Sequence, residues 1–137
     1  SLEAIESLAA PLGITILLEN MDRTFNTTKE IGDALARIPC LGFQLDVGHA
    51  NLNVEKNRTE EFLTAFRDRL AHVHLSDNFG KSEDLHLPLR AGTIPWPKMI
   101  GLLKKSGYDG TVTLEVFSVD RRYLILSRDI LRQLWGE

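Results

Sequence analysis

The sequence has little of what would mark several specialised classes of protein. Its 137 residues include a single cysteine, Cys40, so no disulfide can form within the chain. The longest apolar run, residues 14–18, contains a threonine and is far shorter than the roughly 20 residues that cross a bilayer. The N-terminal residues do not show the basic segment followed by an apolar segment that is typical of a secretory signal. These absences predict a cytoplasmic protein and argue against membrane spans and disulfide scaffolds.

An excess of positive charge is also missing. The chain has 16 Lys and Arg residues against 19 Asp and Glu residues, a formal net charge of −3. A nucleic-acid surface usually needs a basic stripe, so nucleic acid is not an expected partner. No glycine-rich phosphate loop follows a predicted strand, because Gly80-Lys81-Ser82 lacks the upstream glycines. With 43% hydrophobic residues, residues 1–137 are expected to form one domain with an ordinary core.

What the sequence does contain is a repeated alternation of short apolar runs and amphipathic segments. Because parallel strands need a crossover between them, the alternation predicts an α/β fold built of parallel βα units. Residues 1–9 resemble the end of an earlier helix. Strands are expected at 14–18, 41–45, 70–75 and 111–114, and helices at 28–38, 59–69, 96–105 and 120–135.

Side chains able to bind a metal occur at the end of each predicted strand. Glu19 ends the first strand, Asp46 ends the second with His49 three residues later, His74 is near the end of the third, and Glu115 ends the fourth. The carboxyl ends of parallel strands lie on one face, so these side chains should converge. Crowded carboxylates repel one another unless a cation lies among them, and these ligand types suit Mn²⁺, Mg²⁺, Co²⁺ or Zn²⁺. Taken singly, each position is equally well explained by a polar loop beginning there; all four together favour a metal.

Alternation along the strands adds a second layer of polar side chains. Residues two apart in a strand share a face, so Gln44, His72 and Thr113 should lie beneath the predicted ligands. Partners that orient metal ligands are found at such positions. For His72, we prefer the alternative that it is a core histidine bonded to a neighbour.

Five segments, in order along the chain, resemble the xylose isomerase-like TIM-barrel superfamily. This group includes sugar and sugar-phosphate isomerases and epimerases, inosose-type dehydratases and the endonuclease IV repair enzymes. The similarity starts near residue 13, at what would be the fifth barrel strand, and implies the C-terminal half of a TIM (β/α)8 barrel. The segments are Leu18-Glu19-Asn20, Leu45-Asp46-Val47-Gly48-His49, His72-Val73-His74-Leu75-Ser76-Asp77-Asn78, His86-Leu87-Pro88-Leu89 and Leu114-Glu115-Val116-Phe117.

The resemblance implies that Glu19, Asp46, His74 and Glu115 hold a divalent metal, with Mn²⁺ the first choice. In the family's epimerases two glutamates exchange a proton on opposite faces of the sugar, so Glu19 and Glu115 would be the general acid and base. The expected activity is isomerisation or epimerisation of a sugar or sugar phosphate through an enediolate. Members that work by a hydride shift usually add a lysine near the first ligand. The segment Asn20-Met21-Asp22-Arg23 contains none, so proton transfer is preferred to a hydride shift.

The same resemblance implies three substrate-binding residues, His49, His86 and Arg90. His49 matches a substrate-contacting or second-metal histidine. His86 belongs to an Asp84-Leu85-His86 segment where multi-zinc endonucleases carry two ligands, although many sugar-type members share the following residues. Arg90 stands where glycine is usual, and either meets a substrate hydroxyl or phosphate or points into solvent.

Two alternatives to the sugar enzyme are kept. One is an endonuclease IV-like, metal-dependent phosphodiesterase, which the acidic balance of residues 77–84 disfavours. The other is a non-catalytic half-barrel. A barrel needs about 250 residues, so four strands would leave two open edges and, we expect, an apolar inner face. The sequence therefore predicts a homodimer that closes the barrel.

Overall fold

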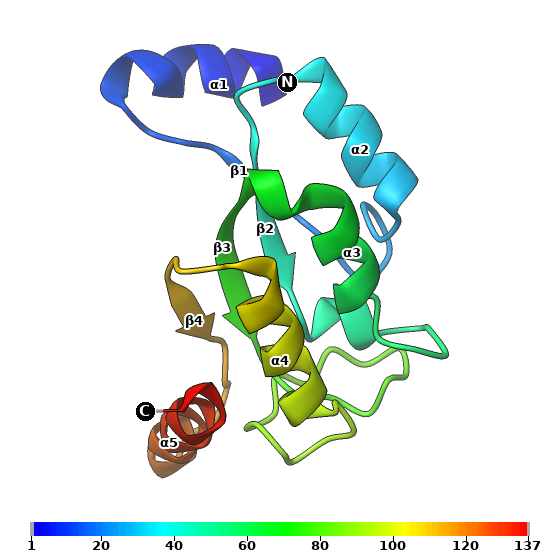
Figure 1. Cartoon of the computed structure of the whole chain (residues 1–137), viewed down its shortest axis with the longest axis vertical. Helices are drawn as coiled ribbons and strands as arrows, with labels where there is room; N and C mark the ends of the chain where they lie inside the picture. The colour runs from blue at the N-terminus through cyan, green and yellow to red at the C-terminus, as the bar shows by residue number, and fades with distance from the viewer. Residues whose placement is uncertain (1, 137) are drawn as a thin grey trace.

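The structure, a computed structural model, describes residues 2–136. Four parallel strands form one sheet in the order β1-β2-β3-β4, with a helix in each connection (Figure 1). The α/β class predicted from the alternation is confirmed. The strands are β1 (Leu17–Glu19), β2 (Gly42–Asp46), β3 (Leu70–Leu75) and β4 (Val112–Leu114). The helices are α1 (Leu2–Ala9), η1 (Ala10–Leu12), α2 (Thr28–Arg37), η2 (His49–Asn51), α3 (Thr59–Phe66), η3 (Arg67–Arg69), α4 (Trp96–Ser106) and α5 (Arg122–Trp135).

Local signals explain where the helices begin and end. The Thr27 hydroxyl accepts a hydrogen bond from the Glu30 N–H, and the Glu30 carboxylate accepts one from the Thr27 N–H, a capping box that starts α2. Proline in the first turn of α4 needs no hydrogen-bond partner for its nitrogen, and Gly107 ends this helix at φ 80°. These signals set the start of α2 and the two ends of α4.

The two faces of the sheet differ in polarity. Apolar strand residues on the outer face, such as Phe43, Leu45 and Val73, are fully buried beneath α2, α3 and α4 (Figure 1). The register places Gln44 and His74 among polar residues on the other face, which is the inner side of a barrel. The expected apolar inner face is therefore wrong: the apolar residues of the alternating strands point toward the helices instead.

The two ends of the strand row are the least covered parts of the molecule. β1 is shorter than the predicted strand, because as an edge strand it pairs on one side only, and Ile14 stays 54% exposed. α1 and α5 lie at opposite ends of the molecule (Figure 1). Both carry exposed apolar side chains: Ile5 and Leu8 in α1, and Leu124, Ile125 and Leu126 in α5.

Among residues 2–136, no helix has the length and hydropathy to cross a membrane.

Candidate metal centre

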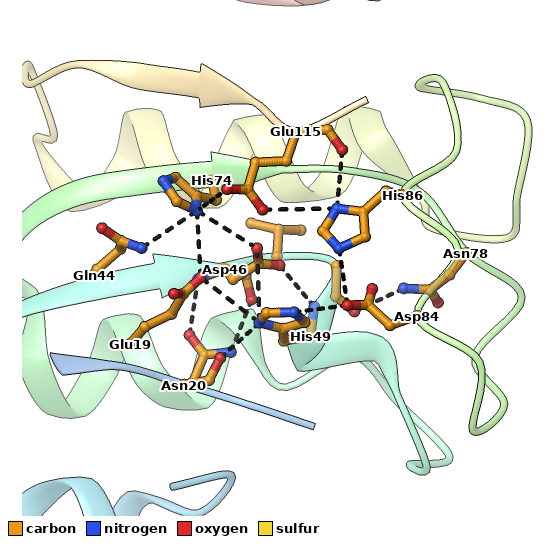
Figure 2. Close-up of polar contacts among 12 residues, drawn as sticks. Glu19, Asn20, Gln44, Asp46, His49, His74, Asn78, Asp84, His86 and Glu115 are labelled. Atoms are coloured by element: carbon orange, nitrogen blue, oxygen red, sulfur yellow. Dashed lines mark hydrogen bonds and ion pairs between the residues drawn. The ribbon is translucent and has the colours of Figure 1, made fainter. Parts of the chain in front are cut away.

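The four side chains predicted as metal ligands meet at the carboxyl ends of the strands (Figure 2). Glu19 ends β1, Asp46 ends β2, His74 is the penultimate residue of β3 and Glu115 directly follows β4. We call them the strand-end group. The Nδ1 atom of His74 lies 3.0 Å from an oxygen of Glu115, 3.3 Å from one of Glu19 and 3.9 Å from one of Asp46. The structure thus brings together the residues that the strand ends predict, while their role as ligands stays a prediction.

Asp46 provides the sharpest test of whether a cation fits here. Its side chain is fully buried; Oδ1 accepts a hydrogen bond from the His49 N–H at 2.7 Å, but Oδ2 accepts none from the described residues. Burial raises the pKa of Asp46 to about 6, although the His49 imidazole and the His49 N–H oppose this shift. A buried carboxylate oxygen without a donor is costly unless a proton or cation meets it. The chemistry of this oxygen therefore fits a divalent metal.

The surrounding groups favour charge at the same place. Burial raises the pKa of Glu19, but the nearby His74 imidazole and Gln44 amide outweigh it and leave the pKa below its ordinary value. The Glu19 and Glu115 carboxylates hold the pKa of His74 above its ordinary value against burial. Glu19 Oε1 is a second buried oxygen that no described residue supplies with a hydrogen bond. Two such oxygens from neighbouring strands form one side of a possible coordination sphere.

A second cluster lies beside the first and comes from loops. His49 lies in η2, and Asp84 and His86 lie in the segment between β3 and α4. We call them the loop group. The Oδ2 atom of Asp84 is 3.0 Å from Nε2 of His49 and 2.9 Å from Nε2 of His86. One ligand atom from each of the three lies within 4.8 Å of the others, so this group could also hold an ion.

Backbone carbonyls determine which nitrogen of each loop-group histidine carries the proton. His49 Nδ1 is 3.0 Å from the carbonyl of Asn20, and His86 Nδ1 is 3.0 Å from the carbonyl of Glu115 (Figure 2). A carbonyl only accepts, so each Nδ1 donates its N–H. In a neutral ring the Nε2 lone pair then faces Asp84, which suits either a bound cation or a shared proton.

The segment that carries Asp84 and His86 is held by a buried carboxylate that sequence reasoning did not single out. Asp77 is fully buried and accepts hydrogen bonds from the backbone N–H groups of Asn78, Arg90 and Ile94 and from the indole of Trp96. An antiparallel bridge with Leu87 adds two backbone bonds. The only advance signal was an acidic residue directly after a buried strand, which is also how an ordinary loop begins. Asp77 therefore organises the loop without touching either group.

The remaining predicted residues are placed less centrally. Arg90 has an exposed side chain, and its predicted substrate contact stays a prediction. His72 lies on the inner face, where its two ring nitrogens are 2.8 and 2.9 Å from the hydroxyls of Thr111 and Thr113. It is thus bonded to neighbours, but it is not a core residue. Gln44 places its amide nitrogen 3.3 Å from Nδ1 of His74, the position expected of a partner that orients a ligand.

Comparisons with known proteins agree with this architecture. Residues 1–134 match the family described as xylose isomerase-like TIM barrel. An uncharacterised protein of Methanocaldococcus jannaschii is 31% identical over 139 residues, which covers 97% of this chain and 46% of that protein. A putative L-ribulose-5-phosphate 3-epimerase of Haemophilus influenzae is 27% identical over 125 residues, which covers 85% of this chain and 43% of that protein.

Solved structures extend the match to three dimensions. The crystal structure of a D-tagatose 3-epimerase-like protein superposes with a TM-score of 0.81 at 29% identity, covering 97% of this chain and 51% of that one. The chain therefore spans about half the length of the relatives it matches. Its four parallel βα units correspond to half of a TIM barrel. The chain belongs to the xylose isomerase-like TIM-barrel family.

Proposed function

We propose that this chain forms the metal-binding half of a sugar or sugar-phosphate epimerase that works by proton transfer. One observation carries the proposal: Glu19 and Glu115 come from opposite edges of the sheet, yet both place a carboxylate oxygen within 3.3 Å of His74 Nδ1. Inversion of a carbon centre needs one group that removes a proton from one face and a second group that returns a proton to the opposite face. Two carboxylates around one point can fill these two roles. The Haemophilus influenzae relative is named a putative 3-epimerase and the similar crystal structure a 3-epimerase-like protein, which supports the same chemistry.

In this proposal the two glutamates divide the proton transfer. One carboxylate removes the proton from the carbon next to the ketose carbonyl, and the electron pair left on that carbon becomes part of an enediolate. The other carboxylate, protonated beforehand, returns a proton to the opposite face, so that one stereocentre is inverted and no oxidant is needed. Neighbouring His74 and Gln44 lower the pKa of Glu19, which favours the ionised form of this carboxylate in the metal-free site.

The strand-end group would hold the divalent metal, with Mn²⁺ our first choice because the donors are three carboxylates and one imidazole. When bound, the metal would polarise the substrate carbonyl and lower the cost of negative charge on its oxygen. We assign substrate binding to His49, His86 and Arg90, of which the two histidines lie beside the strand-end group. An exposed Arg90 side chain at the rim is free to meet a hydroxyl or a phosphate.

The proposal is tested by proton exchange with solvent. The 137-residue chain, loaded with Mn²⁺, is incubated in deuterated water with a set of ketoses and ketose phosphates. Deuterium at the carbon next to the carbonyl is expected, and the variants Glu19→Gln and Glu115→Gln should each lower the exchange rate at least 100-fold. The matched control is Glu60→Gln on the outer surface of α3, where the carboxylate pairs with Lys98 at 3.0 Å. Turnover without solvent deuterium, or equal rates in all variants, would contradict proton transfer by these residues.

A second candidate function follows from the loop group. A cation held there beside one in the strand-end group would resemble the multi-metal arrangement of phosphodiesterases, in which two ions flank a phosphate. The nuclease alternative is tested with a duplex that contains an abasic site, in the presence of Zn²⁺ or Mn²⁺. We expect no cleavage above the rate of a His86→Ala variant, because residues 77–84 are acidic on balance and would repel the backbone.

We also propose that a second copy of the chain closes the barrel. β1 and β4 are free edges of the sheet, and the exposed apolar residues of α1 and α5 flank them. A two-fold pairing would cover both edges with identical contacts. Sedimentation at low micromolar concentration should give about twice the 15.4 kDa mass of the chain. A stable monomer would contradict the pairing.

A further inference from the structure

Asn20 is fully buried directly after β1, and its side chain binds the main chain of a single residue. Oδ1 accepts a hydrogen bond from the Asp46 N–H at 2.8 Å, and Nδ2 donates one to the Asp46 carbonyl at 2.8 Å. The paired residues of β1 and β2 end with Glu19 opposite Gln44. The side-chain amide of Asn20 therefore replaces the backbone hydrogen bonds that a longer β1 would make. It binds β2 at Asp46, two residues beyond the last backbone pair.

The main chain of Asn20 makes a separate contact with the loop group. Its carbonyl oxygen lies 3.0 Å from Nδ1 of His49, so it accepts the proton that this ring carries. Nε2 of the same ring is then directed at Asp84, 3.0 Å away. A side chain that locks the backbone of Asn20 to Asp46 also locks the position of this carbonyl. One residue thus lies between Glu19, its neighbour in sequence, and two other candidate ligands.

We propose that Asn20 is a positioning residue that prepares the ligands before a cation arrives. Its side chain fixes Asp46 relative to Glu19, and its carbonyl holds a proton on Nδ1 of His49, which directs Nε2 at Asp84. The inference rests on the proposed metal site, but the two contacts exist in the metal-free protein and are measurable there. Preorganised ligands bind metal more tightly because less conformational freedom is lost on binding.

The test compares the wild-type chain with Asn20→Ala and Asn20→Ser, without metal and then with Mn²⁺. Without metal, the Asp46 amide proton should exchange with solvent at least tenfold faster in Asn20→Ala, and the ¹⁵N shifts of His49 should indicate a mixture of tautomers. With metal, calorimetric titration should give an affinity about 10- to 100-fold weaker, the range typical for loss of a partner that orients a ligand. Asn20→Ser keeps a polar side chain that is too short to bond both backbone groups of Asp46, so it should be intermediate, which also covers the case in which Asn20→Ala does not fold.

The matched control is Asn26→Ala in the same connection. Asn26 donates to the Asp22 carbonyl at 3.0 Å and contacts neither ligand group, so its loss should affect stability alone. Unchanged Asp46 exchange and a single His49 tautomer in both Asn20 variants would overturn the inference, whatever the metal data. If the wild type binds no Mn²⁺ while the exchange and tautomer changes appear, the positioning role holds and the proposed metal site fails.

Discussion

The strand-end group and the loop group lie side by side, but the chain holds them in different ways. Each strand-end residue stands at or next to the end of a strand whose register is fixed by pairing with its neighbours. In the loop group, Asp84 and His86 depend on a segment between β3 and α4 that is folded around the buried carboxylate of Asp77, whereas His49 in η2 is held by Asn20 and Asp46. The comparison shows that one rim combines a cluster fixed by the sheet with a cluster in which two of the three residues depend on one buried carboxylate. Disturbing the loop should therefore leave the first cluster intact.

The largest effect is expected from Asp77→Ala. Three backbone N–H groups and the Trp96 indole lose their acceptor, and each buried unpaired group costs about 1–3 kcal/mol. We expect the free energy of unfolding, measured in urea, to fall by about 4 kcal/mol. NMR signals of His86 should broaden or shift, while the Mn²⁺ affinity of the folded protein changes less than about threefold because the sheet is unaltered.

The control for this loss is Asp68→Ala. Asp68 is an exposed carboxylate 3.5 Å from Arg67, with 89% of its side chain accessible, so its removal should change stability by less than about 0.5 kcal/mol. If Asp77→Ala weakened Mn²⁺ binding tenfold or more in protein that remains folded, the two groups would form one mechanical unit and the distinction between them would fail.

The second largest effect is expected from Asp46→Asn. This substitution should weaken metal binding but stabilise the metal-free protein. Loss of a buried charged ligand should weaken Mn²⁺ binding at least about 100-fold, or about 2.7 kcal/mol. The metal-free protein should become more stable by about 1–2 kcal/mol at pH 7, because burial of the charged carboxylate is no longer required. The amide oxygen can still accept the hydrogen bond from the His49 N–H.

The pH dependence of this gain follows from the pKa of Asp46. Burial raises it to about 6, above the ordinary value of 3.8, so the folded state disfavours the charged form. The cost is absent below about pH 4 and complete above about pH 6. The stability difference between Asp46→Asn and the wild type should therefore grow as the pH rises from 4 to 7 in urea titrations without metal. A difference that is constant across this range would show that charge burial is not its cause.

The same contrast explains what could be predicted from the sequence. The alternation of apolar and amphipathic segments was sufficient to predict the sheet. The residue types at the strand ends were sufficient to predict the convergence of Glu19, Asp46, His74 and Glu115, because the carboxyl ends of parallel strands lie on one face. The edges were predicted less well: β1 is shorter than its apolar run, since a strand paired on one side has little to extend it.

The geometry of the loop group could not be predicted in this way. His86 adopts a positive φ of 46°, a conformation that is uncommon for any residue other than glycine, and its ring stacks on Phe117 from the connection after β4. Asp77 reaches donors up to 19 residues away in sequence. Such contacts depend on how a long loop buries one carboxylate, and a single sequence contains no periodic signal for that.

A smaller effect is expected from Thr27→Ala, where the side chain bonds with Glu30 at the start of α2. The substitution removes the side-chain half of the capping box at the start of α2, which typically costs about 1 kcal/mol. The free energy of unfolding should fall by that amount, while Mn²⁺ affinity and the His49 and His86 NMR signals stay as in the wild type. A change in either group would mean that loss of stability alone perturbs the rim, and the effects of Asp77→Ala would then need a different explanation.

The smallest effect on the strand-end group is expected from Asp84→Asn. The amide can donate to the free Nε2 of His49 or His86, so the metal-free loop should remain folded. The loop group, however, loses its only carboxylate and should no longer hold a cation. Removal of one partly exposed charge changes the Mn²⁺ affinity of the neighbouring group by about threefold, or about 0.6 kcal/mol, because solvent screens it.

Metal titration followed by elemental analysis separates the two groups in this variant. If both groups bind in the wild type, the Asp84→Asn chain should retain one tightly bound ion and lose the weaker one. If the wild type binds only one ion, the variant should bind it nearly as well. A loss of ten-fold or more in the affinity of the tight site would instead mean that Asp84 acts on the strand-end group through His49, whose Nδ1 lies 3.7 Å from oxygens of both Glu19 and Asp46. The two clusters would then be one coupled centre, with its charge shared across the whole rim.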